Sequence, residues 1–152
     1  MYKWTENDKV IVYFDDTPHV SIRYVVPSMT DAEIKAVKKY PFINKKKITV
    51  RLIDKVKDRA YQFDIPKNYC YDGMTIPRFA WSLIGVSKEN NGGLIASMVH
   101  DYLTEHKELI MNDRALSTNV FNALLCLGHI NPVRRFLMKN SVAMYQTLFC
   151  KW

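Results

Sequence analysis

The spacing of hydrophobic residues along the chain changes near residue 70. Before that point the chain contains short runs of β-branched and aromatic residues, and in most of them apolar and polar residues alternate; these runs are residues 10–14, 20–26, 48–52 and 61–65. Alternation with a period of two predicts half-buried strands. A turn at residues 15–18 and a charged bend at residues 55–58 divide the runs into two pairs. We therefore expect two antiparallel hairpins that pack on each other.

One short helix is expected between these hairpins. Thr30 stands three residues before Glu33, which is the spacing of a capping box, where a hydroxyl and a carboxylate each accept a backbone N–H. Ile34 and Val37 have helical spacing, and Pro41 ends the segment. The sequence therefore predicts a helix that begins after Thr30 and ends before Pro41.

After residue 70 the apolar residues recur with a helical period. The expected helices cover residues 77–85, 94–104, 114–127 and 132–150. No internal repeat or linker divides the chain. We predict an α+β fold in a single domain, residues 1–152. Residues 1–66 are expected to be mainly β, with antiparallel β hairpins and one short helix. Residues 67–152 are expected to be mainly α and to form a C-terminal bundle of about four helices.

The helix expected at residues 94–104 is apolar on two sides and carries a narrow polar strip between them. Met98 and Val99 lie on one wide apolar face, and Leu103 lies nearly opposite. A helix that is apolar on both flanks is buried in most proteins, and buried polar side chains need partners. The polar strip consists of Ser97, His100, Asp101 and Thr104.

The composition is that of a globular protein, with 48% hydrophobic and 24% charged residues. The net charge of +7 is uneven, because residues 35–57 hold nine basic residues against one acidic residue. Residues 131–152 hold four basic residues and no acidic one. Such clusters bind phosphates or acidic proteins, or else form a solvated surface. No recognisable nucleic-acid motif accompanies them, so nucleic acid is a secondary candidate partner.

Three cysteines, odd in number and widely spaced, indicate reduced thiols in a cytosolic compartment. No apolar run approaches the ~18 residues that a membrane-spanning helix requires, and the first residues do not have the pattern of a signal peptide. We therefore expect no membrane partner.

Three sequence blocks, YQFDIP at 61–66, YDGMTIPR at 71–78 and HDYL at 100–103, resemble an uncharacterised domain family of bacteriophages and prophages. Its members combine (Ser/Thr)-Ile-Pro-Arg with a helix that ends in His-Asp-Tyr-Leu. The resemblance covers residues 61–125 and implies a phage origin without implying an activity. The family's next helix carries an Asp shortly before a Phe, whereas this chain has Thr118 and Asn119 before Phe121.

The candidate catalytic residues are His100, Asp101 and Asp72, with Asp113 as a further carboxylate. A histidine with a near-neutral pKa acts as a general base or a metal ligand, and a carboxylate can orient it. This set would suit a hydrolase assisted by a metal ion.

The familiar metal sites are incomplete in this sequence. A His-Asp phosphohydrolase needs further histidines on neighbouring helices, and the other histidines do not have that placement. A zinc site built from Cys70, His100 and Cys126 would lack a closely spaced pair of ligands. We predict no metal and no cofactor.

The alternative to catalysis is a structural polar network. In this network Arg78 pairs with Asp101 across a helix contact, and Asp72 caps the helix that begins near Pro77. The other members of the network are Thr75, Ser97 and Thr104.

We interpret the chain as a phage-encoded virion or tail-associated protein with a structural or assembly role. Its expected partners are other phage proteins or a second copy of itself, and its expected location is the host cytoplasm during infection or the virion. Two alternatives are the metal-assisted hydrolase and a host-directed inhibitor that binds an acidic or nucleic-acid surface through residues 35–57.

Overall fold

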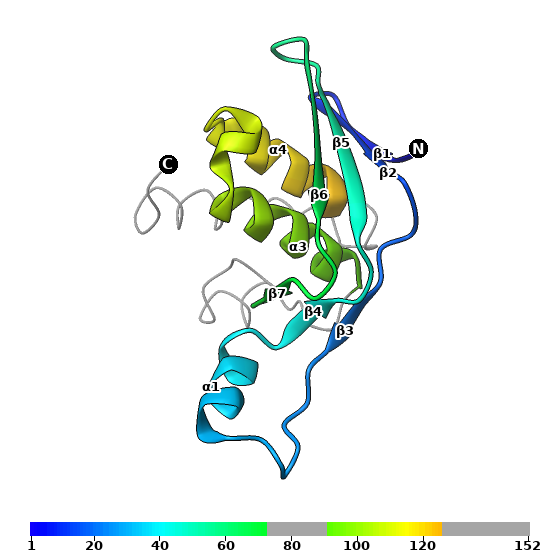
Figure 1. Ribbon diagram of the computed structural model, residues 1–152. Coiled ribbons are helices and arrows are strands. Elements are labelled where there is room, and N and C mark those ends of the chain that lie inside the picture. The colour runs from blue at the N-terminus through cyan, green and yellow to red at the C-terminus, as the bar shows by residue number, and fades with distance from the viewer. Residues whose placement is uncertain (73–90, 126–152) are drawn as a thin grey trace, which may run out of the picture.

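The computed structural model describes residues 1–72 and 91–125, and the strands in this part of the chain form two antiparallel sheets (Figure 1). The large sheet has the order β1-β2-β5-β6, and the small sheet has the order β3-β4-β7. The strands are β1 (Tyr2–Glu6), β2 (Val10–Phe14), β3 (Val20–Ile22), β4 (Phe42–Asn44), β5 (Ile48–Asp54), β6 (Arg59–Ile65) and β7 (Cys70–Tyr71).

The hairpin expected in the middle of the chain is confirmed. Strands β5 and β6 pair in register from Ile48 opposite Ile65 to Asp54 opposite Arg59. Asp54 closes the turn, because its Oδ1 accepts the backbone N–H groups of Val56 at 2.9 Å and Lys57 at 3.3 Å. The buried carboxylate at the end of β5 is thus paired with the turn that it stabilises.

The first expected hairpin, which joined residues 10–14 to residues 20–26, is wrong. Strand β2 pairs with β1 on one side and β5 on the other, whereas β3 pairs with β4 in the small sheet. Both edges of β2 are therefore occupied, and residues 15–19 carry the chain from the large sheet to the small one. Strands β1, β4 and β7 were not predicted.

The two sheets join at Asn44, which is fully buried. Its side-chain Nδ2 donates to the carbonyl oxygen of Pro66 at 3.0 Å and to that of Ile65 at 3.4 Å. Its backbone N–H donates to the carbonyl of Tyr69 at 2.8 Å, and its own carbonyl accepts the N–H of Asn68 at 2.7 Å. Asn44 thus holds the connection between β4 and β5 against the connection between β6 and β7.

The helix predicted after Thr30 is confirmed as α1 (Asp31–Lys39). Its capping box is present in both directions, since the Thr30 hydroxyl accepts the N–H of Glu33 and the Glu33 carboxylate accepts the N–H of Thr30. Val37 is its buried residue. Figure 1 shows α1 set apart from the large sheet, beyond the small sheet.

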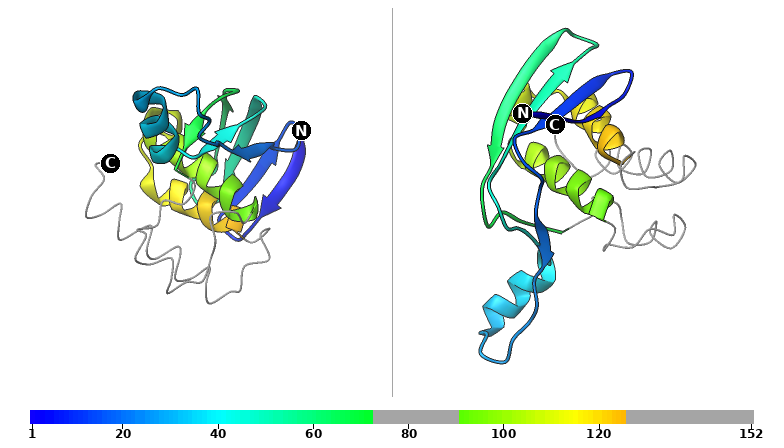
Figure 2. Two further views of the ribbon diagram at one scale, coloured as in Figure 1. Left: turned by 90° about the horizontal axis from the view of Figure 1, so that it is seen from below. Right: turned by 90° about the vertical axis from the view of Figure 1, so that its right-hand side faces the viewer.

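The expected C-terminal bundle of about four helices is wrong, and with it the predicted fold class. The described part of residues 67–152 contains α3 (Asn91–Glu105), a 3-10 turn at Lys107–Ile110 and α4 (Arg114–Leu125). Helices α3 and α4 pack side by side on one face of the large sheet (Figure 2). Antiparallel sheets with helices laid on one face replace the bundle. The helices expected at 77–85 and 132–150 lie outside the described residues, and the single-domain expectation remains a prediction.

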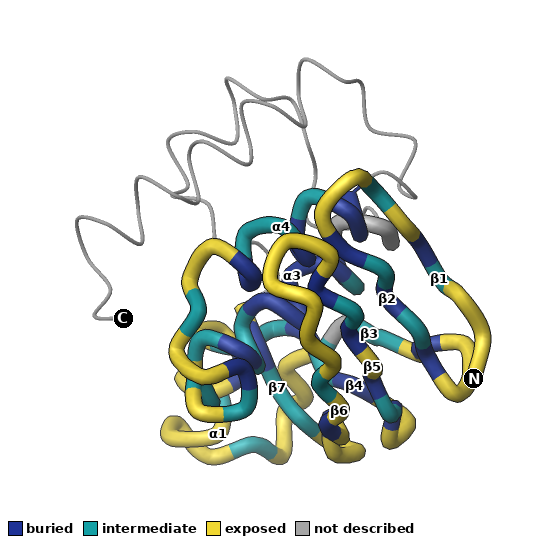
Figure 3. Tube along the Cα trace, turned by 90° about the horizontal axis from the view of Figure 1, so that it is seen from above, coloured by how far each residue is buried: buried dark blue, intermediate teal, exposed yellow. Residues whose placement is uncertain are grey.

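The hydrophobic core lies between the large sheet and these two helices (Figure 3). Val10, Val12 and Phe14 of β2 face it and are completely buried, as the period of two requires. Thr5 of β1 is buried at the same face, and its hydroxyl donates to the carbonyl of Ala123 in α4 at 3.0 Å. The sheet and the helices therefore share one apolar interior.

Replacing Asn44 with Ala should destabilise the protein, because the buried carbonyl oxygen of Ile65 and the partly buried one of Pro66 would lose their donor. We expect the free energy of unfolding to fall by about 2 kcal/mol, measured by urea denaturation. Asn7→Ala is a control in an exposed turn, where only the backbone N–H groups of Lys9 and Val10 lose an acceptor. If Asn44→Ala is as stable as this control, the hydrogen bonds of Asn44 do not stabilise the junction between the sheets.

Candidate functional site

His100 lies in the second half of α3 and is almost completely buried, with 1% of its surface exposed. Burial lowers its pKa to about 4, and the negative charge of Asp72 opposes part of that shift. The imidazole is therefore neutral at physiological pH. The burial expected for the polar strip is confirmed for His100 and for Ser97, while Asp101 and Thr104 are half-buried.

The surroundings of His100 combine one aromatic ring with polar groups of α3. The edge of its ring meets Phe121 of α4, with the ring centroids 5.1 Å apart. The hydroxyl of Thr104 donates to the backbone carbonyl of His100 at 2.9 Å. Asp101 Oδ1 lies 4.0 Å from His100 Nδ1, which is too long for a hydrogen bond. The two neighbouring side chains on the helix therefore do not form a simple dyad.

The structure nevertheless brings Asp72 and Asp101 to the same region. Asp72 follows β7 and is exposed, and its charge acts on His100. Burial raises the pKa values of Tyr69 and Tyr71, and the charge of Asp101 raises both further. The three predicted site residues and two tyrosines thus gather where β7 meets α3.

Tyr69 and Tyr71 were missed by the sequence reasoning. Both hydroxyls are buried, and Glu105 of α3 acts on the hydroxyl of Tyr69 through its charge and a hydrogen bond that raise the pKa of the tyrosine further. The two rings stack at 6.0 Å, and Tyr69 meets Tyr102 of α3 edge-on at 5.1 Å. The available signal was the Tyr-x-Tyr alternation directly before Asp72, which marks a short strand with both rings on one side.

Asp113 belongs to a different part of the structure. Its Oδ1 accepts the N–H of Leu116 at 3.1 Å and so caps α4, and its Oδ2 pairs with Lys57 Nζ at 2.8 Å. Burial alone would raise the pKa of Asp113, but Lys57 and the first amides of α4 hold it below its usual value. We therefore assign Asp113 a structural role.

The other predicted members cannot be placed, because Thr75, Arg78 and Cys126 lie outside the described residues. Within residues 1–72 and 91–125, no three His, Cys, Asp or Glu side chains are grouped so that they could hold a metal ion. What the described site offers chemically is a buried neutral imidazole, one half-buried and one exposed carboxylate, and two buried phenol hydroxyls.

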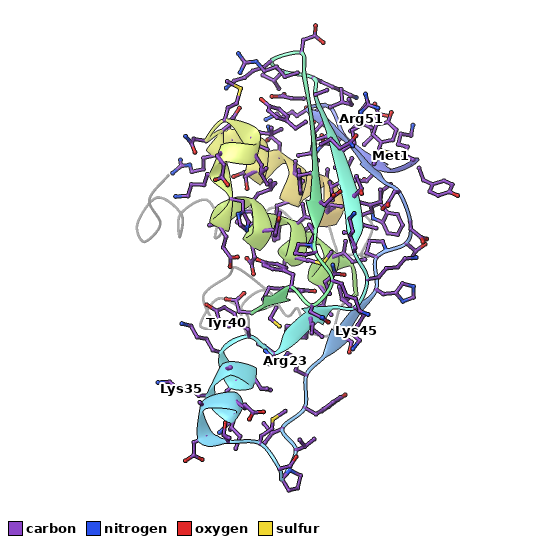
Figure 4. The ribbon with its side chains drawn as sticks, viewed as in Figure 1. Met1, Arg23, Lys35, Tyr40, Lys45 and Arg51 are labelled. Atoms are coloured by element: carbon purple, nitrogen blue, oxygen red, sulfur yellow. The ribbon has the colours of Figure 1, made fainter. Side chains whose placement is uncertain are left out.

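A second surface feature lies on the opposite face of the large sheet. A hollow of about 430 Å³ is lined by Met1, Tyr13, Arg51 and Ile53. Figure 4 shows Met1 and Arg51 on this outer side, away from α3 and α4. The lining contains no acid that could work with Arg51 as an acid–base pair, so the hollow is a weaker candidate for catalysis than the His100 region.

The positive cluster at residues 35–57 is partly neutralised by folding. Four of its lysines pair with carboxylates from other segments: Lys46 with Asp16, Lys47 with Asp64, Lys55 with Glu6 and Lys57 with Asp113. The lysines of α1 are exposed, and Figure 4 shows Lys35 pointing away from the rest of the protein. The three lysines of α1 therefore remain exposed, beside the exposed acids Asp31 and Glu33 of the same helix.

The fold and the site define a small protein of antiparallel sheets with a buried histidine on the helix beneath them. Residues 48–142 match a family described as a protein of unknown function, DUF1353, and because this is more than half of the chain, the protein belongs to that family. The matched range begins at β5 and includes His100, whereas β1 to β4 and α1 precede it. Comparisons with curated proteins and with solved structures gave no match.

Among the described residues, none of the helices combines the length and the apolar character needed to cross a bilayer.

The burial of His100 predicts a specific dependence of stability on pH. The unfolded chain binds a proton at His100 as the pH falls through about 6.5, whereas the folded chain does so only near pH 4. The stabilisation is therefore complete above pH 6.5 and is lost between pH 6.5 and 4, by on the order of 3 kcal/mol. Urea denaturation across this range should show the loss in the wild type and a smaller loss in His100→Gln.

The exposed His19 provides the control, since His19→Gln should keep the wild-type dependence on pH. Carboxylates with lowered pKa values, including Asp64 and Asp113, lose their contribution at lower pH and affect all three proteins equally. An unchanged slope in His100→Gln would contradict the burial of a neutral imidazole.

Proposed function

We propose that the protein is a phage- or prophage-encoded structural or assembly component of the virion or tail that acts through protein–protein contacts. The resemblance of its Thr-Ile-Pro-Arg and His-Asp-Tyr-Leu motifs to phage proteins supports the origin. The role in assembly is supported by the segment that joins β3 to β4, because this segment exposes apolar side chains. We call this segment, residues 23–41, the arm.

The arm projects from the described body of the protein in Figure 1 and in the right-hand view of Figure 2. Tyr24, Val25 and Val26 are consecutive and expose 73%, 48% and 43% of their surfaces. A run of adjacent exposed apolar residues is costly in water, and such patches mark sites of protein contact. The arm therefore provides a contact surface that the protein's own described residues leave uncovered.

Hydrogen bonds hold the arm in a defined shape. Arg23 donates through its guanidinium to the carbonyl of Tyr40 at 3.1 Å and through its backbone N–H to Pro41 at 2.7 Å. Figure 4 shows Arg23 and Tyr40 together at the base of the arm. The capping box of α1 fixes its far end. A partner would therefore meet a pre-organised surface, which reduces the entropy cost of binding.

The metal-assisted hydrolase remains the second candidate, because Asp72, His100 and Asp101 converge in the fold. His100 is buried and neutral, which suits a ligand or base but equally suits a packing role. A stoichiometric equivalent of zinc, manganese or calcium in the purified wild-type protein, lost in His100→Gln, would favour this candidate. We expect no such equivalent in metal analysis of the purified protein.

The third candidate, the host-directed inhibitor, depends on the exposed lysines of α1. Binding to an acidic surface or to nucleic acid through these charges would weaken steeply with salt. The apolar character of Tyr24 to Val26 favours a contact that persists at high salt, so assembly is the better-supported role.

The proposed function predicts that the protein accompanies phage particles or their assembly intermediates. In particles purified from a strain that carries the gene, quantitative mass spectrometry should find it at a constant ratio to the major structural proteins. Tyr24→Lys should lower that ratio about tenfold or more, the effect of losing ~1.4 kcal/mol of contact energy. Tyr2→Lys, which changes another exposed tyrosine at 69% exposure, should leave it unchanged. Absence from particles and intermediates alike would overturn the proposal.

A further inference from the structure

The outer face of the large sheet carries apolar and aromatic side chains at its centre. Ile11 and Tyr13 of β2 and Ile53 of β5 alternate with the buried core residues of their strands, and each is half-buried. Ile11 lies directly opposite Ile53, and Tyr13 lies opposite Arg51. An antiparallel sheet with helices on one face commonly presents polar residues on the other. These three side chains therefore form an apolar strip that the packing of the core does not require.

A hollow of about 430 Å³ opens on this strip and combines its side chains with one positive charge. Its lining consists of Met1, Tyr13, Arg51 and Ile53. Figure 4 shows Met1 and Arg51 on the side of the sheet that faces away from α3 and α4. Sites for small molecules commonly have volumes of ~300–1,000 Å³ and a mostly apolar lining with a few polar groups that orient the ligand. The hollow has this size and this composition.

Arg51 brings to the hollow a charge that the described residues do not neutralise. Its side chain is exposed, and no ion pair of Arg51 occurs within residues 1–72 and 91–125. Glu6 and Asp64, the carboxylates that the strands place on the same face, each pair with lysines. A guanidinium suits a carboxylate ligand, because its planar N–H groups match the two oxygens. The hollow therefore offers an anion-binding group beside an apolar surface.

We propose that this hollow binds a small organic anion that has an aromatic or aliphatic body and a carboxylate. Its carboxylate pairs with the guanidinium of Arg51, and its body covers Ile53 and the ring of Tyr13. The apolar contact adds a binding energy that a simple ion lacks, because the hydrophobic contribution grows with the area removed from water. The hollow and the His100 region lie on opposite faces of the sheet, so the inference goes beyond the proposed function and does not depend on it.

Titration of the purified full chain with 3-phenylpropionate, followed by the chemical shifts of backbone amides in NMR spectra, tests the inference. This probe has an aromatic body and one carboxylate. 3-Phenylpropionamide has the same body without the charge, and acetate has the charge without the body. We expect saturable shifts at Tyr13, Arg51 and Ile53 with a dissociation constant of about 1 mM or lower. The amide and acetate should each bind about tenfold more weakly or worse.

Three variants separate the two parts of the site. Arg51→Gln should raise the dissociation constant of 3-phenylpropionate about tenfold and leave that of the amide unchanged, because only the charged contact is lost. Ile53→Thr keeps a β-branched side chain in the strand and should weaken the binding of both probes. Arg59→Gln is the matched control, since this exposed arginine of the same sheet donates to Met111 Sδ at 3.4 Å and is not part of the lining. The control should bind as the wild type does, and all three variants should keep the wild-type circular dichroism.

Several results would overturn the inference. They are the absence of saturable shifts with 3-phenylpropionate, an amide that binds as tightly as the acid, and an Arg51→Gln variant that binds the acid as tightly as the wild type. Shifts that centre on the lysines of α1 would show a general attraction of anions to a basic protein and would also overturn it. Sedimentation velocity tests the other occupant of an apolar face. A wild-type dimer that Ile53→Thr dissociates, without binding of the probe, would assign the face to a second copy and contradict the inference.

Discussion

The arrangement of the two sheets depends on the hydrogen bonds of Asn44. At this position β4 leaves the small sheet and the chain turns toward β5 of the large sheet, while residues 66–69 cross beside it toward β7. Each crossing segment has backbone groups that no sheet ladder can satisfy. Asn44 supplies both a backbone and a side-chain partner for them, so the angle between the sheets has one low-energy value. The position of β7 beside α3, and of the arm away from it, follows from that angle.

The placement of β7 explains why a polar cluster forms around His100. Tyr71 and Asp72 arrive at α3 from the small sheet, whereas Phe121 reaches His100 from α4. A histidine held between two helices, with its charged form excluded by burial, fixes how those helices meet. The same environment would suit a general base only if a substrate reached it. Asp72 is the exposed member of the cluster, so any such access would come from the β7 side.

Local patterns in the sequence were sufficient for the β5–β6 hairpin, for α1 with its capping box and for the burial of Ser97 and His100 on α3, because each depends on residues close in sequence. Strand pairing was not predictable in the same way. Alternation indicates that residues 10–14 form a strand but not that β1 and β5 flank it. The sequence did contain an indication that the helices do not form a bundle. Ala96 and Leu103 lie opposite the main apolar face of α3, and both are completely buried. A helix apolar on both sides fits between a sheet and another helix as well as it fits in a bundle.

The arm shows a disagreement of another kind between sequence and fold. Val20, Ile22, Tyr24 and Val26 alternate as in a half-buried strand, but β3 forms only over Val20–Ile22. Yet the alternation continues through Tyr24 and Val26, where the structure leaves both side chains in water. The alternation therefore continues past the end of the strand, and its last two apolar residues are not part of the core. The arm, residues 23–41, precedes the range matched by the family, residues 48–142, whereas His100 lies within that range.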